Sequence, residues 1–262
     1  MSIFFPIILS NEIFKSSTIV YNFPPNNHEG IALKKRYLTV IWMKDDLWHT
    51  YLLRELDPCD VAEVKYESLK KIVPAGIFPV LSLTDSPLET TLKNLPLNTL
   101  PFTTPCWRAS ICLQRAASST SYQGEIAPFS PKGTLVSFSP FIQSKSNIKN
   151  YFILLNIESE PINREANVSF CLLRSPENIL ATSRLVSNNC NIVDLDYLDI
   201  EKEDILICYS RNISGVPLFL SYSDDDSTIS FEHTHPPASL VIHGNRLQSQ
   251  ALLKRNWFKV LP

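Results

Sequence analysis

Apolar and polar residues alternate along much of the chain after residue 106. In the segment 107–114 every second residue is apolar, namely Trp107, Ala109, Ile111 and Leu113. A period of two is typical of a β-strand that buries one face. Further strands are expected at 134–138, 151–157, 168–174, 179–187, 205–210, 216–222, 228–233 and 239–243. Short strands that recur about every ten residues between polar turns predict a mainly β protein, with an antiparallel β-sandwich of the Ig-like or jelly-roll type.

The first 93 residues follow a less regular pattern. The apolar run at 2–10 lacks the basic start of a signal peptide, so it predicts a buried first strand. Strands are also expected at 36–42 and 78–83, and apolar residues near a helical spacing predict helices at 45–56 and 61–73. Residues 1–93 are therefore expected to form a smaller mixed α/β part.

A proline-rich segment at 94–105 separates the two regions. It contains Pro96, Pro101 and Pro105 and no charged residue, and a segment of this kind is extended and does not enter the interior of a sheet. It predicts an interdomain linker or, less favoured, a long strap across one domain. Residues 106–262 are then expected to form one β-sandwich domain. From Asn245 onward, a capping residue, apolar positions and late Lys and Arg residues predict a closing C-terminal helix.

Composition and charge exclude several classes of function. The 262 residues include 24 Lys and Arg and 26 Asp and Glu, and the formal net charge of −2 gives no electrostatic reason to expect nucleic acid. The 6 glycines are too scattered for a dinucleotide fingerprint or a P-loop. No apolar run reaches the ~18 residues of a spanning helix, so no membrane span is expected. The 6 cysteines form no CxxC pair, and reduced thiols in a cytoplasmic protein are expected.

Three of the histidines, His233, His235 and His243, lie near the end of the β region. Residues two apart on a strand share a face, so His233 and His235 would bind one divalent metal ion together, with His243 as a third ligand. A two-residue hairpin at Pro236–Pro237 would place His243 on the opposite face from His233, so the three-histidine site requires a wider connection. The alternative is a core or rim histidine that is hydrogen-bonded to a carbonyl group.

The polar segment 118–125 is the second candidate site. It is predicted to be an edge strand or a loop, and it offers hydroxyl, amide and carboxylate groups. With the arginine upstream, these groups would bind a polyhydroxylated ligand such as a sugar, and Tyr122 or Trp107 would be the stacking platform. An ordinary serine-rich loop is the alternative. The candidate ligand-binding residues are Arg108, Tyr122, Gln123 and Glu125.

Recognisable catalytic motifs are missing from the sequence. No serine lies in a GxSxG motif, and no cysteine has a catalytic context. The predicted sandwich and the missing catalytic motifs therefore favour a non-enzymatic binding or interaction module whose loops bind a protein or a glycan. The alternative is a metal-dependent enzyme on a β-barrel or jelly roll that uses the His-x-His site. The sequence leaves open whether the chain is an enzyme.

Overall fold

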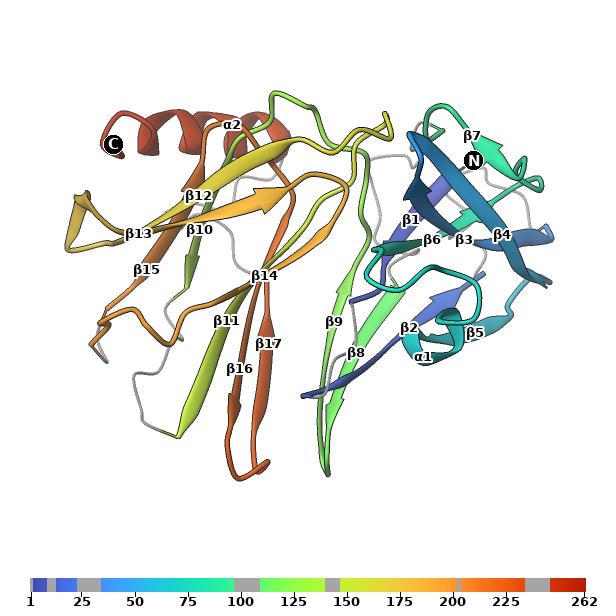
Figure 1. Cartoon of the computed structure of the whole chain (residues 1–262), viewed down its shortest axis with the longest axis horizontal. Helices are drawn as coiled ribbons and strands as arrows, with labels where there is room; N and C mark the ends of the chain where they lie inside the picture. Colours follow the sequence, from blue (N-terminus) through green and yellow to red (C-terminus); the bar gives the residue numbers. More distant parts are fainter. Residues whose placement is uncertain are drawn as a thin grey trace. The chain divides into compact units, whose positions relative to one another are not determined.

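Strands dominate the structure, and they group into four sheets (Figure 1). The structure is a computed structural model that describes residues 2–8, 13–22, 34–96, 109–139, 147–201, 204–233 and 246–262. The chain divides into two compact units, of which unit 1 comprises residues 1–129, 155–163 and 188–190 and unit 2 comprises 130–154, 164–187 and 191–262. The mainly β class and the sandwich architecture predicted from the sequence are confirmed.

Unit 1 contains a five-stranded and a four-stranded antiparallel sheet. The five-stranded sheet has the order β1-β6-β3-β4-β7 and consists of β1 (Ser2–Pro6), β3 (Arg36–Lys44), β4 (Leu47–Leu56), β6 (Pro79–Thr84) and β7 (Thr91–Leu92). The four-stranded sheet has the order β5-β2-β8-β9 and consists of β2 (Lys15–Tyr21), β5 (Val61–Lys65), β8 (Ala109–Arg115) and β9 (Ser118–Gly124). A short helix, α1 (Tyr66–Leu69), follows β5.

The two sheets of unit 1 share one apolar core. Alternate residues of the strands point into it, and they include the buried Val20 of β2, Leu38 of β3 and Leu83 of β6. A polar group on the inner face of β2 is hydrogen-bonded rather than buried alone, because Thr18 Oγ1 donates to Pro6 O at 2.8 Å. The inner face of each sheet is therefore buried in this core.

Unit 2 contains two four-stranded sheets and the C-terminal helix. One sheet has the order β10-β15-β12-β13 and consists of β10 (Leu135–Ser139), β12 (Glu165–Leu172), β13 (Ser175–Val186) and β15 (Leu206–Ser210). The other has the order β14-β11-β16-β17 and consists of β11 (Ile148–Leu155), β14 (Cys190–Asp194), β16 (Val216–Ser223) and β17 (Ile229–Glu232). Helix α2 (Arg246–Trp257) confirms the predicted closing helix.

The sheet β10-β15-β12-β13 is packed on both faces. Its inner face meets the other sheet of unit 2, and there Phe152 lies against Phe170 and Phe219, with ring centroids 5.7 and 5.5 Å away. Its outer face meets the C-terminal helix, where Trp257 lies edge-on to Phe138 at 4.7 Å. The helix therefore covers apolar side chains that would otherwise face water.

The helix predicted at 45–56 is wrong, because residues 47–56 form β4. Of the helix predicted at 61–73 only α1 is helical, and residues 61–65 form β5. The reason for the first difference lies in the turn before β4, where Asp45 and Asp46 both have positive φ, 52° and 55°. Two such residues make the tight turn of a β-hairpin, and the hairpin pairs β4 with β3 in place of a helix.

Two observations after residue 96 concern the predicted division of the chain into a part at 1–93 and a domain at 106–262. Residues 97–108, which include most of the proline-rich segment, and residues 239–243, the last predicted strand, lie outside the described residues. Strands β8 and β9, which follow the proline-rich segment, pair with β2 in unit 1. Residues 109–124 are thus part of the same sheet as residues 15–21.

Replacing Phe170 by Ala tests the packing of unit 2. The ring is fully buried, and a cavity of this kind lowers the free energy of unfolding by about 3–5 kcal/mol. Ile179→Ala is the control, because Ile179 is 47% exposed on the same sheet and its loss costs about 0.5 kcal/mol or less. Urea denaturation measures both values, and equal effects would contradict the assigned core.

Candidate functional site

The outward face of the sheet β5-β2-β8-β9 carries small hydroxyl and amide side chains. On β2, Thr18 and Val20 are buried while their neighbours Ser17, Ile19 and Tyr21 are partly exposed. The same alternation continues on β8 and β9, so the outward residues of three strands share one surface. We call this surface the hydroxyl face, and it consists of Ser17, Ile19, Tyr21, Ser110, Cys112, Gln114, Ser119, Ser121 and Gln123.

The strand register arranges the hydroxyl face in rows that run across the strands. Paired residues on neighbouring strands lie directly opposite each other, and neighbouring strands are about 4.8 Å apart. The first row is Ser17, Cys112 and Ser121, and the second is Ile19, Ser110 and Gln123. A third row, nearer the start of β2, is Lys15, Gln114 and Ser119. Each row therefore presents side chains at a regular spacing along one line.

Apart from Lys15 in the third row, the hydrogen-bonding side chains of the hydroxyl face are neutral. Gln114, Ser119, Ser121 and Gln123 are exposed, and hydroxyl and amide groups both donate and accept hydrogen bonds. Tyr21 adds an aromatic ring at one end, and its hydroxyl lies 3.2 Å from Ser110 Oγ. The arrangement can bind a neutral polar ligand that lies flat on the strands.

Cys112 lies in the middle of the first row and is neutral as well. Burial raises the pKa of its thiol, the negative charge of Glu63 raises it further, and a hydrogen bond with Ser17 opposes the shift. The sulfur also lies 3.9 Å from Ser110 O. A thiol with a raised pKa stays protonated at neutral pH, so Cys112 contributes contact surface rather than a nucleophile.

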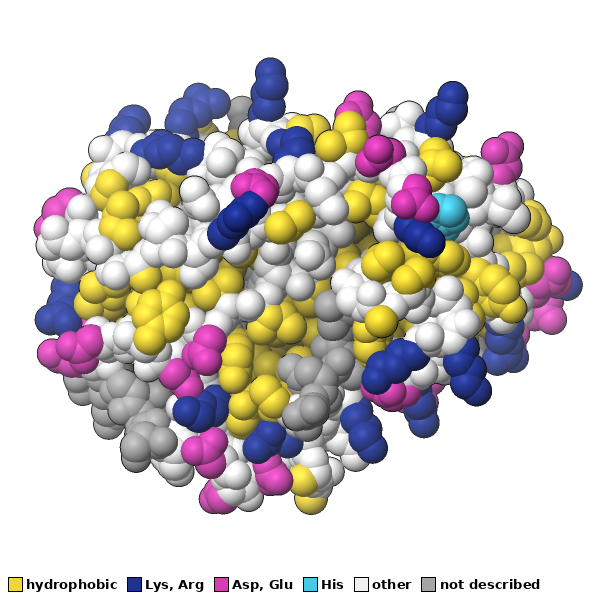
Figure 2. Space-filling view, viewed as in Figure 1, with side chains coloured by type: hydrophobic (Ala, Val, Ile, Leu, Met, Phe, Trp, Pro, Cys, Tyr) yellow, Lys and Arg dark blue, Asp and Glu magenta, His cyan; other side chains and the backbone are white. Residues whose placement is uncertain are grey.

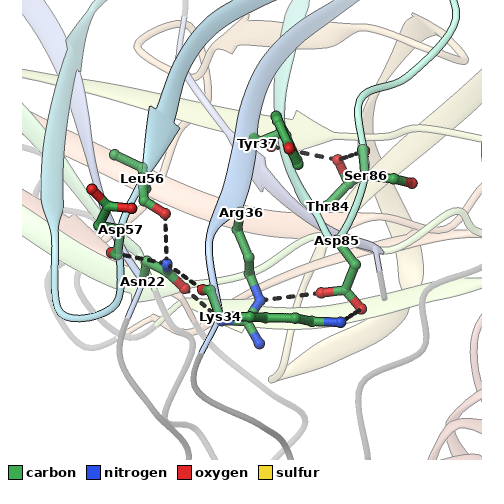
Figure 3. Close-up of polar contacts among 9 residues, drawn as sticks. All are labelled: Asn22, Lys34, Arg36, Tyr37, Leu56, Asp57, Thr84, Asp85 and Ser86. Atoms are coloured by element: carbon green, nitrogen blue, oxygen red, sulfur yellow. Dashed lines mark hydrogen bonds and ion pairs between the residues drawn. The ribbon is translucent and has the colours of Figure 1, made fainter.

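A buried amide fixes the end of β2, next to Tyr21. The side chain of Asn22 is fully buried, and its Nδ2 donates to Lys34 O at 3.1 Å, Leu56 O at 2.9 Å and Asp57 O at 3.0 Å (Figure 3). These acceptors belong to the segments that precede β3 and end β4. Asn22 therefore ties one end of the hydroxyl face to the other sheet of unit 1.

A buried arginine lies beside Asn22, and we call Asn22, Arg36 and Asp85 the buried anchor. Arg36, the first residue of β3, is only 1% exposed, and its Nη1 donates to Asn22 Oδ1 at 2.5 Å while its Nε lies 3.3 Å from Asp85 Oδ1 (Figure 3). Lys34 Nζ lies 2.8 Å from the other oxygen of Asp85. Burial alone would raise the pKa of Asp85, but hydrogen bonds and charges of neighbouring cations, Lys34 foremost, outweigh it and lower the pKa. The carboxylate is thus held in its charged form.

The structure separates the predicted ligand-binding residues. Gln123 is exposed and belongs to the hydroxyl face, whereas Tyr122 points to the opposite side of β9. The Tyr122 ring packs over Gly124, so closely that a Cβ at position 124 would lie 2.4 Å from its Cε1 atom. Glu125 follows the strand and is partly buried, and Arg108 and Trp107 lie outside the described residues. Tyr122 and Gln123 thus cannot contact one flat ligand together.

Sequence reasoning missed Tyr21 and Ser17, which the pairing of β2 with β8 brings beside the predicted segment. Buried and exposed positions alternate along residues 15–21, but the sequence predicts no strand there. It does identify the polar side of residues 107–114, since Ser110, Cys112 and Gln114 alternate with apolar residues. The sequence does not show that β2 and β8 are neighbours in one sheet.

The structure describes one of the three predicted metal ligands. Nδ1 of His233 lies 2.6 Å from Pro217 O on the neighbouring strand β16, while His235 and His243 lie outside the described residues. A histidine bonded to a carbonyl through Nδ1 is the expected rim histidine, yet metal-ligating histidines use the same bond to orient Nε2. Among the described residues, no group of three His, Cys, Asp or Glu side chains could hold a metal ion. The metal site stays a prediction.

Comparisons of the chain with protein-family models, with curated proteins and with solved structures find no match. Within the part of the chain that the structure describes, no helix is long and apolar enough to cross a membrane.

Asp85→Asn tests the buried anchor through its pH dependence. Because the pKa of Asp85 is lowered in the folded state, its stabilising effect is complete above the ordinary carboxyl pKa of about 3.9 and disappears as pH falls through the lowered value. At pH 7 the free energy of unfolding of the variant should be about 2–3 kcal/mol lower than that of the original protein. At the lowest pH the two free energies should be equal. Denaturant melts from pH 7 to about 2 measure this. Asp57→Asn, at an exposed aspartate, is the control. If the Asp85→Asn variant stays less stable than the original protein at low pH, the charge of Asp85 is not what stabilises the fold.

Metal analysis of the purified protein tests the histidine site. If His233 and His235 bind a divalent ion, the protein should contain about one ion per chain, and His235→Ala should lose it. His49→Ala is the matched control, since His49 stacks on Trp42 in unit 1 and takes no part in the predicted site. A metal-free protein, or equal metal content in both variants, would remove the site.

Proposed function

We propose that the chain is a non-enzymatic binding module that holds an oligosaccharide on the hydroxyl face. The observation that supports this is the regular set of rows across β2, β8 and β9, in which serine and glutamine side chains alternate with inward apolar residues. Sugar rings carry several hydroxyl groups at similar spacings. Neutral donors and acceptors on a rigid sheet can match them without the cost of removing a charge from water.

The apolar members of the hydroxyl face favour the same ligand class. Tyr21 and Ile19 lie on alternate positions of β2 and are partly exposed, so they provide a small apolar area beside the polar rows. The face of a sugar ring consists of C–H groups and packs on an aromatic ring. Asn22 and Arg36 hold the backbone next to Tyr21 in place, and a preorganised contact loses less entropy on binding.

A protein partner fits the hydroxyl face less well. Protein interfaces have an apolar centre rich in large aromatic residues and Met or Arg. Here the central row consists of Ser17, Cys112 and Ser121, which are small. Glu63 and Lys65 on β5 place opposite charges at the margin, so the face has no single charge that would select a charged protein.

A glycan array followed by calorimetry tests this function. The protein should bind a restricted set of oligosaccharides, and Ser121→Ala combined with Gln123→Ala should weaken binding of the best ligand about tenfold, since each lost hydrogen bond contributes about 0.5–1.5 kcal/mol. Tyr21→Phe should retain more affinity than Tyr21→Ala, because the ring provides the stacking surface.

Asn167→Ala is the matched control for these variants. Asn167 is an exposed amide on β12 of unit 2 and does not belong to the hydroxyl face of unit 1, so its removal should leave affinity unchanged. Two outcomes would refute the proposal: an array without any bound glycan, or a loss of affinity that is the same for Asn167→Ala and for the double variant.

A further inference from the structure

The C-terminal part of the chain differs in charge from the rest. All Asp and Glu residues of the protein precede residue 233, whereas residues 233–262 contain Arg246, Lys254, Arg255 and Lys259 and no acidic residue. The whole chain has a formal net charge of −2. A charge asymmetry of this kind points to a partner of opposite charge for the basic segment.

The structure sorts this segment into a packed side and an exposed side. Trp257, Phe258 and Leu261 pack against the outer face of the sheet β10-β15-β12-β13, and Lys254 Nζ donates to Thr134 O at 2.9 Å. Leu252 and Arg255 on α2, and Lys259 and Val260 in the turn that follows α2, are exposed. We call these four residues the basic surface.

The cations of the basic surface are exposed and have no acidic residue close to them in the sequence, since the last Asp or Glu before them is Glu232. Lys259 Nζ lies 3.4 Å from the side-chain oxygen of Asn256. Arg211 lies beside this surface but is engaged in holding the segment: its guanidinium lies 4.7 Å from the centre of the Phe258 ring and donates to the backbone oxygens of Phe258, Leu261 and Pro262. Figure 2 shows Lys and Arg side chains gathered on the part of the surface over α2.

Aliphatic side chains lie among these cations. Leu252 is 53% and Val260 is 52% exposed, and both would gain from removal of their surface from water. Nucleic acid binding would favour exposed aromatic rings for stacking on bases, but here Trp257 and Phe258 pack against the sheet. Cations interspersed with exposed aliphatic side chains match the interface of an anionic lipid bilayer, where the charges meet headgroups and the aliphatic groups enter the boundary region.

We propose that the basic surface, on α2 and the turn after it, binds anionic phospholipid membranes. The contact is peripheral, because Arg255 and Lys259 would meet the headgroups while the opposite side of α2 stays on its sheet. Attraction between exposed charges is screened by salt. Binding should therefore be reversible and strongest at low ionic strength. This surface lies in unit 2 and is independent of the hydroxyl face in unit 1.

Sedimentation of the full chain with vesicles tests this proposal. The probes are vesicles of phosphatidylcholine alone and vesicles with about 30% phosphatidylserine. The protein should sediment with the anionic vesicles and not with the neutral ones, and binding should fall between about 0.05 and 0.5 M salt. Arg255→Glu with Lys259→Glu should reduce binding at least about tenfold, because each reversal replaces an attraction by a repulsion. Leu252→Asn should reduce it less.

Lys44→Glu with Lys70→Glu is the matched control, because it changes the net charge equally at two exposed lysines of unit 1. This variant should bind anionic vesicles nearly as well as the original protein. Circular dichroism checks that each variant keeps its strand content. No sedimentation with anionic vesicles, or equal losses in the two double variants, would each overturn the proposal.

Discussion

Each sheet of this protein depends on burying one face against a neighbouring layer, and this constraint determines where function can reside. In unit 1 the inner faces of two sheets share a core that includes Val20, Leu38 and Leu83. Side chains that alternate with the core residues of β2, β8 and β9 must then face outward. The hydroxyl face is the consequence of this alternation. Its composition, rather than its position, distinguishes it from an ordinary solvent-facing sheet.

The anchor at the end of β2 connects stability with the proposed site. Asn22 donates to three backbone carbonyls and accepts a hydrogen bond from Arg36, and the buried charge of Arg36 faces the carboxylate of Asp85. A buried charge that loses its partner is strongly destabilising. Changes at Asp85 should therefore disturb Tyr21 through the backbone of Asn22, although neither Asp85 nor Asn22 belongs to the hydroxyl face.

Local patterns in the sequence were sufficient for most strands of unit 2, because alternation and polar turns need only neighbouring residues. They were insufficient at β4, where the left-handed residues Asp45 and Asp46 make a hairpin that apolar spacing does not reveal. They were also insufficient for the site. Ser17 and Cys112 lie far apart in the chain and are paired only because β2 pairs with β8, and the contacts of Arg36 likewise come from distant segments. Such long-range pairings leave no periodic signal in one sequence.

Amide hydrogen exchange with and without a bound oligosaccharide locates the ligand without substituting any residue. We expect slower exchange along β8 and β9 and at the end of β2, with unit 2 unchanged. Protection confined to the strands of unit 2, or to the inner-facing segments of unit 1, would contradict the assignment of the hydroxyl face as the binding surface.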